Sequence, residues 1–215
     1  MRDDPERLWQ AFVRYVEPTS VIVEAGAHLG EDTVRLSELV PEGHVYSFEP
    51  VEAVYQQLSS RSKHLANVTT FQLALSGGIG RAGIFVSSGA SDGSSSLLQP
   101  KEHLRYYPRI TFEESAAVPT TTLDTWATQN TVIRVDALWL DLQGLELQVL
   151  QAATNVLEHV RVIHTEVNLR ELYAGAALYQ ELREWLGERG FRPIEEDLPW
   201  EEGGNVVFAR VGDEG

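Results

Sequence analysis

Short apolar runs alternate with helical segments through most of this chain of 215 residues, and this order restricts the fold more than any other feature. The runs have the length and composition of buried strands, and the segments between them have helical spacing of apolar residues. The expected strands are 21–25, 44–48, 68–73, 138–142 and 160–165, and the expected helices are 31–39, 51–65 and 145–157. Because a parallel pair of strands needs a crossover connection, the pattern predicts a doubly wound, mostly parallel α/β sheet.

The two ends of the chain depart from this alternation. Residues 1–18 predict an N-terminal helix that Asp3 or Asp4 caps. Near the other end, a helix over 177–189 precedes two strands with only an acidic loop between them, 191–194 and 205–210. Strands joined in this way favour an antiparallel hairpin, which we place at the edge of the sheet. No break in composition divides the chain, so we expect a single domain.

The middle of the chain is less regular. A strand at 81–86 leads into a stretch rich in Ser and Gly, residues 87–96, which predicts a flexible segment. Aromatic and basic side chains follow, before a strand at 117–121 and a helix that starts near Leu123. Long irregular segments in compact domains are mostly functional or disordered, and the aromatic side chains lead us to expect a lid over 87–116.

The first expected strand ends in a glycine turn, Gly-x-x-x-Gly, that opens the next helix. Gly26 allows the tight turn, and Gly30 lets the helix approach a ligand closely. A turn that binds diphosphate prefers Gly-x-Gly-x-x-Gly, whereas here the bulky His28 stands inside the turn. Acidic side chains around the turn repel phosphate and favour a cation: Glu24, Glu31 and Asp32. We therefore expect Glu24, Gly26, His28 and Gly30 to bind a positively charged nucleoside such as S-adenosylmethionine.

A second signal is Glu49, which stands at the end of the second expected strand. An acid at this place can accept hydrogen bonds from both hydroxyl groups of a ribose. The alternative interpretation is structural: the two glycines pack the helix against the strand, and Glu49 caps the helix that follows it.

Polar side chains also stand at the ends of two later strands. Asp141 ends the fourth strand, Glu166 and Asn168 end the fifth, and His164 shares a strand face with Glu166. In open α/β sheets the chemistry takes place beyond the carboxyl ends of the strands, so Asp141, Glu166 and His164 are the catalytic candidates, and Asp141 also faces the cofactor. The alternatives are helix capping for the acids and a core position for His164. Oxygen ligands on adjacent strand ends also suit Mg²⁺, which leaves a metal site as a further alternative.

Charge and composition narrow the partners. Asp and Glu total 32 against 17 Lys and Arg, so the formal net charge is −15, and there are no cysteines. The electrostatic field of a chain with this negative charge repels nucleic acid and anionic membranes, so we expect a small-molecule acceptor as the partner. The absence of cysteine excludes disulfides and thiolate metal sites. The N-terminus lacks the apolar core of a signal peptide, so we expect a cytoplasmic location.

Seven short pieces of the sequence, in this order, resemble the FkbM-type S-adenosylmethionine-dependent methyltransferases. Each piece is weak alone, but the ordered set is specific and extends over roughly two-thirds of the chain. The pieces are Val-Glu-Ala-Gly-Ala-His-Leu-Gly-Glu-Asp-Thr (23–33), Ser-Phe-Glu-Pro (47–50), Ala-Leu-Ser (74–76), Ser-Ser-Leu (95–97), Thr-Thr-Leu-Asp (121–124), Leu-Asp-Leu-Gln-Gly-Leu-Glu (140–146) and His-Thr-Glu-Val (164–167).

The resemblance implies a class I methyltransferase (Rossmann-like) fold with a seven-stranded sheet. It implies O-methylation of a small hydroxylated acceptor such as a sugar or a polyketide. It also implies further cofactor contacts from Thr33, Ala74, Ser95 and Ser96. One departure is that the family often has Glu where this chain has Gln143, which removes a carboxylate and weakens the case for a catalytic or metal role there.

Two other functions compete with methyl transfer. The first is a catalytically silent domain that binds a nucleoside or a protein partner, which the loss of a carboxylate at Gln143 allows. The second is an NAD-dependent oxidoreductase, against which the missing Gly-x-Gly-x-x-Gly argues. The sequence carries no readable code for the acceptor or for the oligomeric state.

Overall fold

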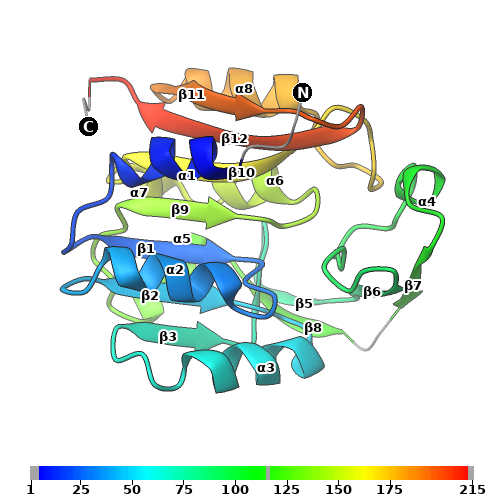
Figure 1. Ribbon diagram of the computed structural model, residues 1–215, viewed down its shortest axis with the longest axis horizontal. Coiled ribbons are helices and arrows are strands. Elements are labelled where there is room, and N and C mark those ends of the chain that lie inside the picture. The colour runs from blue at the N-terminus through cyan, green and yellow to red at the C-terminus, as the bar shows by residue number, and fades with distance from the viewer. Residues whose placement is uncertain (1–4, 115–116, 213–215) are drawn as a thin grey trace.

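The computed structural model of the protein describes residues 5–114 and 117–212. At its centre lies a seven-stranded sheet in the order β11-β12-β10-β9-β1-β2-β3, with helices on both faces (Figure 1). The strands are β1 (Val21–Ala25), β2 (His44–Phe48), β3 (Val68–Phe71), β9 (Ala137–Leu140), β10 (Val162–Asn168), β11 (Phe191–Asp197) and β12 (Gly203–Arg210). The pairs from β3 to β10 are all parallel, which confirms the predicted doubly wound sheet.

The edge of the sheet is the predicted antiparallel hairpin. The strand β12 pairs antiparallel with both β10 and β11, so it lies between them and β11 forms the edge. The hairpin is longer than expected, because β11 continues to Asp197 and takes in acidic residues that we assigned to the loop. At the start of β12, a side chain at Gly203 would overlap the backbone oxygen of Val167, so glycine permits the close approach to β10.

Helices cover the two faces of the sheet. On one face lie α1 (Pro5–Val13) and α2 (Glu31–Leu39), packed on Ile22 and Trp139. On the other lie α5 (Leu123–Gln129), α6 (Glu146–Gln151), α7 (Thr154–Leu157) and α8 (Tyr179–Gly187), packed on Val23 and Leu138. The helix α3 (Glu52–Ser62) lies along β3. The expected caps of α1, Asp3 and Asp4, lie outside the described residues. Within the described parts of the chain, no helix combines the length and the apolarity that crossing a membrane requires.

The single helix expected over 145–157 is wrong, because the structure has two short helices there. The break falls at Ala152–Ala153, and Asp124 then stabilises the start of α7. Its carboxylate accepts hydrogen bonds from the backbone N–H groups of Asn155 and Val156, at 3.0 and 2.9 Å. Free N–H groups at the start of a helix need such acceptors, and here a side chain from another helix supplies them.

The strand expected over 81–86 is also wrong, because these residues divide between two small sheets. One sheet holds β4 (Ala74–Leu75), β8 (Val118–Thr121) and β5 (Gly80–Ala82), and the other pairs β6 (Phe85–Gly89) with β7 (Ile110–Glu114). Ile84, between β5 and β6, is buried and faces a cavity, so the chain changes direction there. We call residues 85–114, which include α4 (His103–Tyr106), the arm; it extends to one side of the main sheet (Figure 1).

Candidate active site

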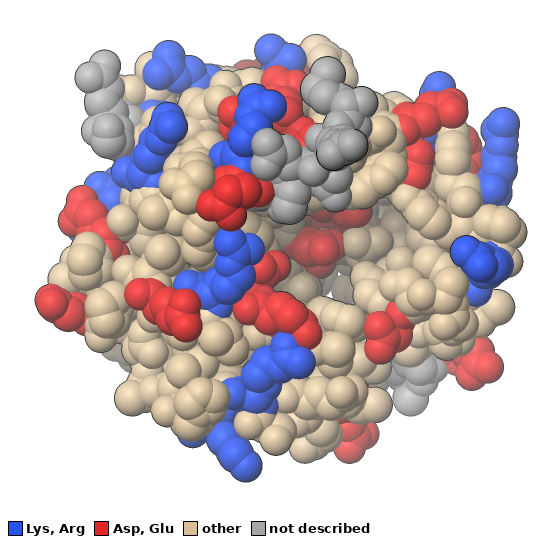
Figure 2. All heavy atoms as spheres, in the orientation of Figure 1, with Lys and Arg blue, Asp and Glu red and all other residues tan. Residues whose placement is uncertain are grey.

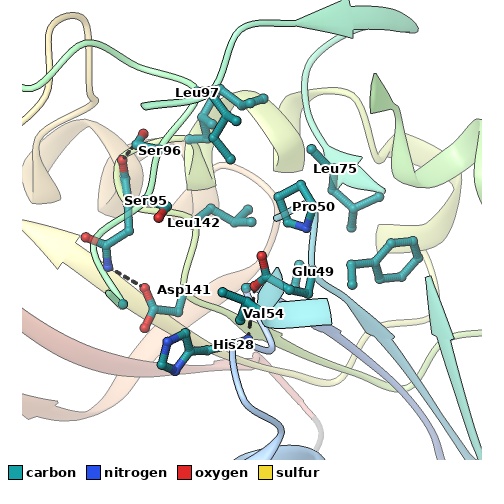
Figure 3. A pocket seen from close by; sticks show the side chains of 18 of the residues that line it. His28, Glu49, Pro50, Val54, Leu75, Ser95, Ser96, Leu97, Asp141 and Leu142 are labelled. Carbon is teal, nitrogen blue, oxygen red and sulfur yellow. Dashed lines mark hydrogen bonds between the residues drawn. The ribbon is translucent and has the colours of Figure 1, made fainter. Parts of the chain in front are cut away.

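A cavity of about 780 Å³, counting the open space at its mouth, lies beyond the carboxyl ends of β1, β2 and β9 (Figure 3). Gly26, Glu49 and Asp141, each of which follows one of these strands, line the cavity together with Ser95 and Ser96 of the arm. Open α/β sheets bind ligands at this place.

The glycine turn brings the backbone close to β9. Gly26 has φ +83°, and a side chain there would overlap the backbone oxygen of Asp141. The N–H groups of Gly26 and Ala27 donate to the carbonyl oxygen of Phe48, at 3.1 and 3.0 Å, which fixes the turn against the end of β2. His28 also adopts the left-handed region, with φ +46°, which is uncommon for a residue with a side chain and marks a conformation that the surroundings enforce.

Glu49 joins this turn to the start of α3. One carboxylate oxygen accepts from the N–H of His28 at 3.2 Å, and the other accepts from the N–H of Val51 at 2.8 Å. Burial raises the pKa of Glu49 to about 7, although both hydrogen bonds act in the opposite direction. Glu49 is therefore a buried carboxyl group at the cavity wall, held in place by two backbone donors.

A side-chain contact joins the turn to the arm beside the cavity. The Nε2 atom of His28 lies 3.0 Å from an Oδ1 atom of Asp92. Both residues line the cavity, and His28 lies below Asp141 in Figure 3. The serine-rich segment, which we expected to be flexible, is also held by hydrogen bonds: the N–H of Ser94 donates to Ser87 Oγ, and Ser96 Oγ donates to the carbonyl oxygen of Gln143.

The residues expected to contact the cofactor divide into two groups. Gly26, His28, Glu49, Ala74, Ser95, Ser96 and Asp141 line the cavity. Glu24 and Thr33 lie behind the turn, where Glu24 accepts hydrogen bonds from the hydroxyl groups of Thr33 and Ser47, at 2.6 Å each. Gly30 packs against Leu58 of α3. These three residues shape the turn from behind, because the side chain of Glu24 points to the α2 face of the sheet.

A second cavity, of about 1150 Å³ with its open mouth, lies between the arm and the ends of β10 and β12. Glu166 and Asn168 line it from β10, and Tyr107 of the arm donates a hydrogen bond to Glu202 at its wall. Figure 2 shows the surface hollowed beside the arm, with acidic side chains in its depth. Gln143 lines both cavities, so the two meet at this residue.

Three carboxyl groups surround this junction: Glu146 is buried, Glu166 is partly buried, and Asp141 is exposed where it lines the first cavity. The side-chain amide of Gln143 donates to Asp141 Oδ1 at 2.6 Å and to Glu166 Oε2 at 2.9 Å. Glu146 Oε1 accepts from the N–H groups of Leu142 and Gly144, at 2.8 and 3.3 Å. Burial raises the pKa of all three carboxyl groups, that of Glu146 to about 7, and the negative neighbours raise them further. The described residues contain no group of three His, Asp or Glu side chains that could hold a metal ion, so the Mg²⁺ alternative gains no support.

His164, a catalytic candidate from the sequence, lies in the core. Its ring stacks on Trp139, with centroids 3.7 Å apart and planes 8° apart, on the α1 and α2 side of the sheet. Burial lowers its pKa to about 3, so the imidazole is neutral at ordinary pH. These surroundings give His164 a packing role in place of the expected catalytic one.

The sequence missed two residues that organise the junction. In the sequence, Gln143 stands out only because it replaces a family carboxylate, and no pattern marks Tyr173 as a site residue. The Tyr173 hydroxyl lies 2.8 Å from Gln143 Oε1 and 2.8 Å from the carbonyl oxygen of Ser94. The one local sign is Gly144 after Gln143, because a glycine in the segment that follows a strand marks a turn.

Comparison with known proteins finds a matching protein family. The model of the methyltransferase FkbM domain matches residues 24–193. The 2-O-methyltransferase NoeI of Sinorhizobium fredii is 31% identical over 164 residues, which are 74% of this chain and 68% of that protein.

Two solved structures share the fold. SMU.1697c from Streptococcus mutans, in complex with S-adenosylhomocysteine, has a TM-score of 0.56 at 14% identity, over 98% of this chain and 100% of the other. Fibrillarin of Aeropyrum pernix, with bound S-adenosylmethionine, has a TM-score of 0.52 at 13% identity, over 91% of this chain and 68% of the other. At these identities the likeness shows the class I methyltransferase fold alone.

Proposed function

The chain belongs to the FkbM family of S-adenosylmethionine-dependent methyltransferases, and from this premise we propose that it methylates a hydroxyl group of a small acceptor. The observation that supports this most strongly is the meeting of two cavities at Gln143, with Asp141 on one side and Glu166 on the other. A two-substrate transfer needs both substrates held in adjoining sites with a proton acceptor between them.

The first cavity fits the cofactor by its chemistry. Glu49 offers carboxylate oxygens to the ribose hydroxyls, and each oxygen keeps accepting capacity beyond its single backbone donor. The absence of a side chain at Gly26 lets the turn lie against the backbone of Asp141, so that both residues line the same cavity. Three carboxyl groups line the walls, Glu49, Asp92 and Asp141, and they favour a cation over a phosphate.

The second cavity is the acceptor site in this proposal. S-adenosylmethionine supplies the methyl group: the acceptor oxygen bonds to the methyl carbon, the carbon–sulfur bond breaks with its electron pair left on sulfur, and the hydroxyl proton passes to a carboxylate. Asp141 and Glu166 are the carboxylates at the junction, and Asp141 is our first choice for the base. The net charge of −15 supports a small acceptor over a nucleic acid.

Incubation with isotope-labelled S-adenosylmethionine tests the proposal directly. We would offer a panel of sugars, phenols and polyketide-like alcohols, with an RNA transcript as a separate arm, and follow the label by mass spectrometry. We expect the label on the oxygen of a small hydroxyl compound. Label on RNA would overturn the choice of acceptor, and tight binding of S-adenosylhomocysteine without transfer to any acceptor would favour the silent nucleoside-binding domain.

A further inference from the structure

We propose that Gln143 is a positioning residue: its side-chain amide holds Asp141 and Glu166 together where the two cavities meet. The inference rests on the proposed function, because the acid pair is the proton acceptor only in that reaction. Its structural basis is a set of hydrogen bonds that the methyl-transfer assignment alone does not require.

The amide group of Gln143 contacts both acids at once. Its nitrogen lies 2.6 Å from Asp141 Oδ1 and 2.9 Å from Glu166 Oε2, and an amide nitrogen carries two hydrogens. Each carboxyl group therefore receives one donor from the same side chain. Asp141 faces the first cavity and Glu166 faces the second, so this bridge crosses the boundary between the two sites.

The two acids set which end of the amide faces them. The Tyr173 hydroxyl lies 2.8 Å from both Gln143 Oε1 and the carbonyl oxygen of Ser94, and its single hydrogen can be donated to only one of these two acceptors at a time. A reversed amide would set its oxygen against two carboxyl groups and lose both donated bonds. The orientation with nitrogen toward the acids is therefore the one that satisfies the network.

The backbone of Gln143 is held as firmly as its side chain. The residue has φ +52°, which costs energy for a residue with a side chain, and its carbonyl oxygen accepts from Ser96 Oγ of the arm at 2.8 Å. Surroundings that enforce a strained conformation at the meeting point of two cavities indicate that the position of the amide matters. A glutamate at this place would add a further carboxyl group and, when ionised, would have no hydrogen to donate.

The acid pair sits among further ionisable groups, which any titration must take into account. These groups are His28 in the turn after β1, Asp32 in α2, Glu49 directly after β2, Tyr107 in the arm, Glu146 in α6 and Tyr173 in the segment before α8. The negative charge of Asp141 raises the pKa of Glu166, and burial raises the pKa of both carboxyl groups. The amide of Gln143 favours the ionised form of both.

The test is a carboxyl ¹³C NMR titration of the full chain labelled at Asp and Glu, which needs no acceptor. Gln143→Leu removes the donor and keeps a side chain of similar size. We expect the pKa values of Asp141 and Glu166 both to rise relative to the wild type, because each loses a bond that stabilises its charge. Tyr173→Phe, which removes only the hydroxyl group beside the amide oxygen of Gln143, should raise both pKa values by a smaller amount. The control Gln180→Glu changes an exposed amide that bonds to Glu184, and should leave both titrations unchanged.

Binding of S-adenosylhomocysteine, measured by calorimetry on the same samples, separates this inference from the proposed function. If Gln143→Leu binds the ligand normally while Asp141 and Glu166 titrate as in the wild type, the amide is only structural and the inference is wrong. If Gln143→Leu does not fold, the same comparison on Tyr173→Phe decides. Failure of the wild type to bind the ligand would refute the proposed function, and the titration would still report whether the amide bridges the pair.

Discussion

The N–H group of His28 donates a hydrogen bond to the carboxylate of Glu49 at 3.2 Å, which ties the strained turn after β1 to the end of β2. Both residues line the cofactor cavity, so the same carboxylate that shapes the turn also faces the ligand. The geometry therefore links the conformation of the turn to cofactor binding through a single side chain.

Replacing Glu49 tests this link. Glu49→Ala should weaken the binding of S-adenosylhomocysteine by roughly ten- to a hundred-fold, because hydrogen bonds to a charged group contribute about 1.5–3 kcal/mol. Glu49→Gln, which keeps one acceptor oxygen, should weaken binding by a smaller factor. Calorimetric titration measures both, with the exposed Glu38→Ala on α2 as the control. Equal affinity of all three variants would remove Glu49 from the site.

The acids around the cavity predict a choice between cofactors. S-adenosylmethionine or S-adenosylhomocysteine should raise the melting temperature, whereas NAD, with two phosphates, should not. A ligand at a hundred times its dissociation constant stabilises the folded state by about 2.7 kcal/mol, which a thermal-shift assay resolves easily. Stabilisation by NAD alone would contradict the assignment of the cavity.

The buried Glu24 predicts how stability depends on pH. Burial raises its pKa from 4.5 to about 8 in the folded state, so the folded chain binds this proton more tightly than the unfolded chain does. The contribution of Glu24 to stability is therefore complete below about pH 4.5 and is lost as the pH rises through about 8. Glu24→Gln keeps an acceptor for Thr33 and Ser47 but cannot ionise, so its stability relative to the wild type should increase between these limits. Urea unfolding of both proteins across this interval measures the difference, and a constant difference would show that Glu24 does not titrate there.

The sequence predicted the parts of the fold that local patterns determine. The strands at Val21–Ala25 and His44–Phe48 agree with the structure at both ends, because apolar runs bounded by turn residues mark strands buried on both faces. The division of 81–86 between two sheets could not be predicted, since it depends on where the buried Ile84 packs. The hydrogen bond between Tyr173 and Gln143 joins residues 30 positions apart, and no periodicity encodes such a contact.

The contact between His28 and Asp92 predicts an effect on ligand release. Both side chains are partly exposed, so the pair contributes at most about 1 kcal/mol. Asp92→Ala should therefore increase the dissociation rate of S-adenosylhomocysteine by less than about ten-fold, with little change in the melting temperature of the free protein. Stopped-flow displacement measures the rate. A rate equal to that of the wild type would mean that this contact does not slow ligand release.

The sharpest prediction concerns Asp141 as the base. Asp141→Asn keeps the shape of the side chain and an oxygen that can accept from Gln143, but it removes the group that would take the acceptor's proton. Loss of a general base lowers the rate by about 10²–10⁴-fold. With an identified acceptor, we therefore expect the variant to lose almost all turnover while it still binds S-adenosylhomocysteine. Glu166→Gln is the matched variant, because Glu166 receives the other hydrogen bond from the same amide. If Asp141 is the base, Asp141→Asn lowers the rate of a single turnover more than Glu166→Gln does. The reverse order would make Glu166 the base, and near-normal turnover in both variants would place the proton acceptor outside this pair.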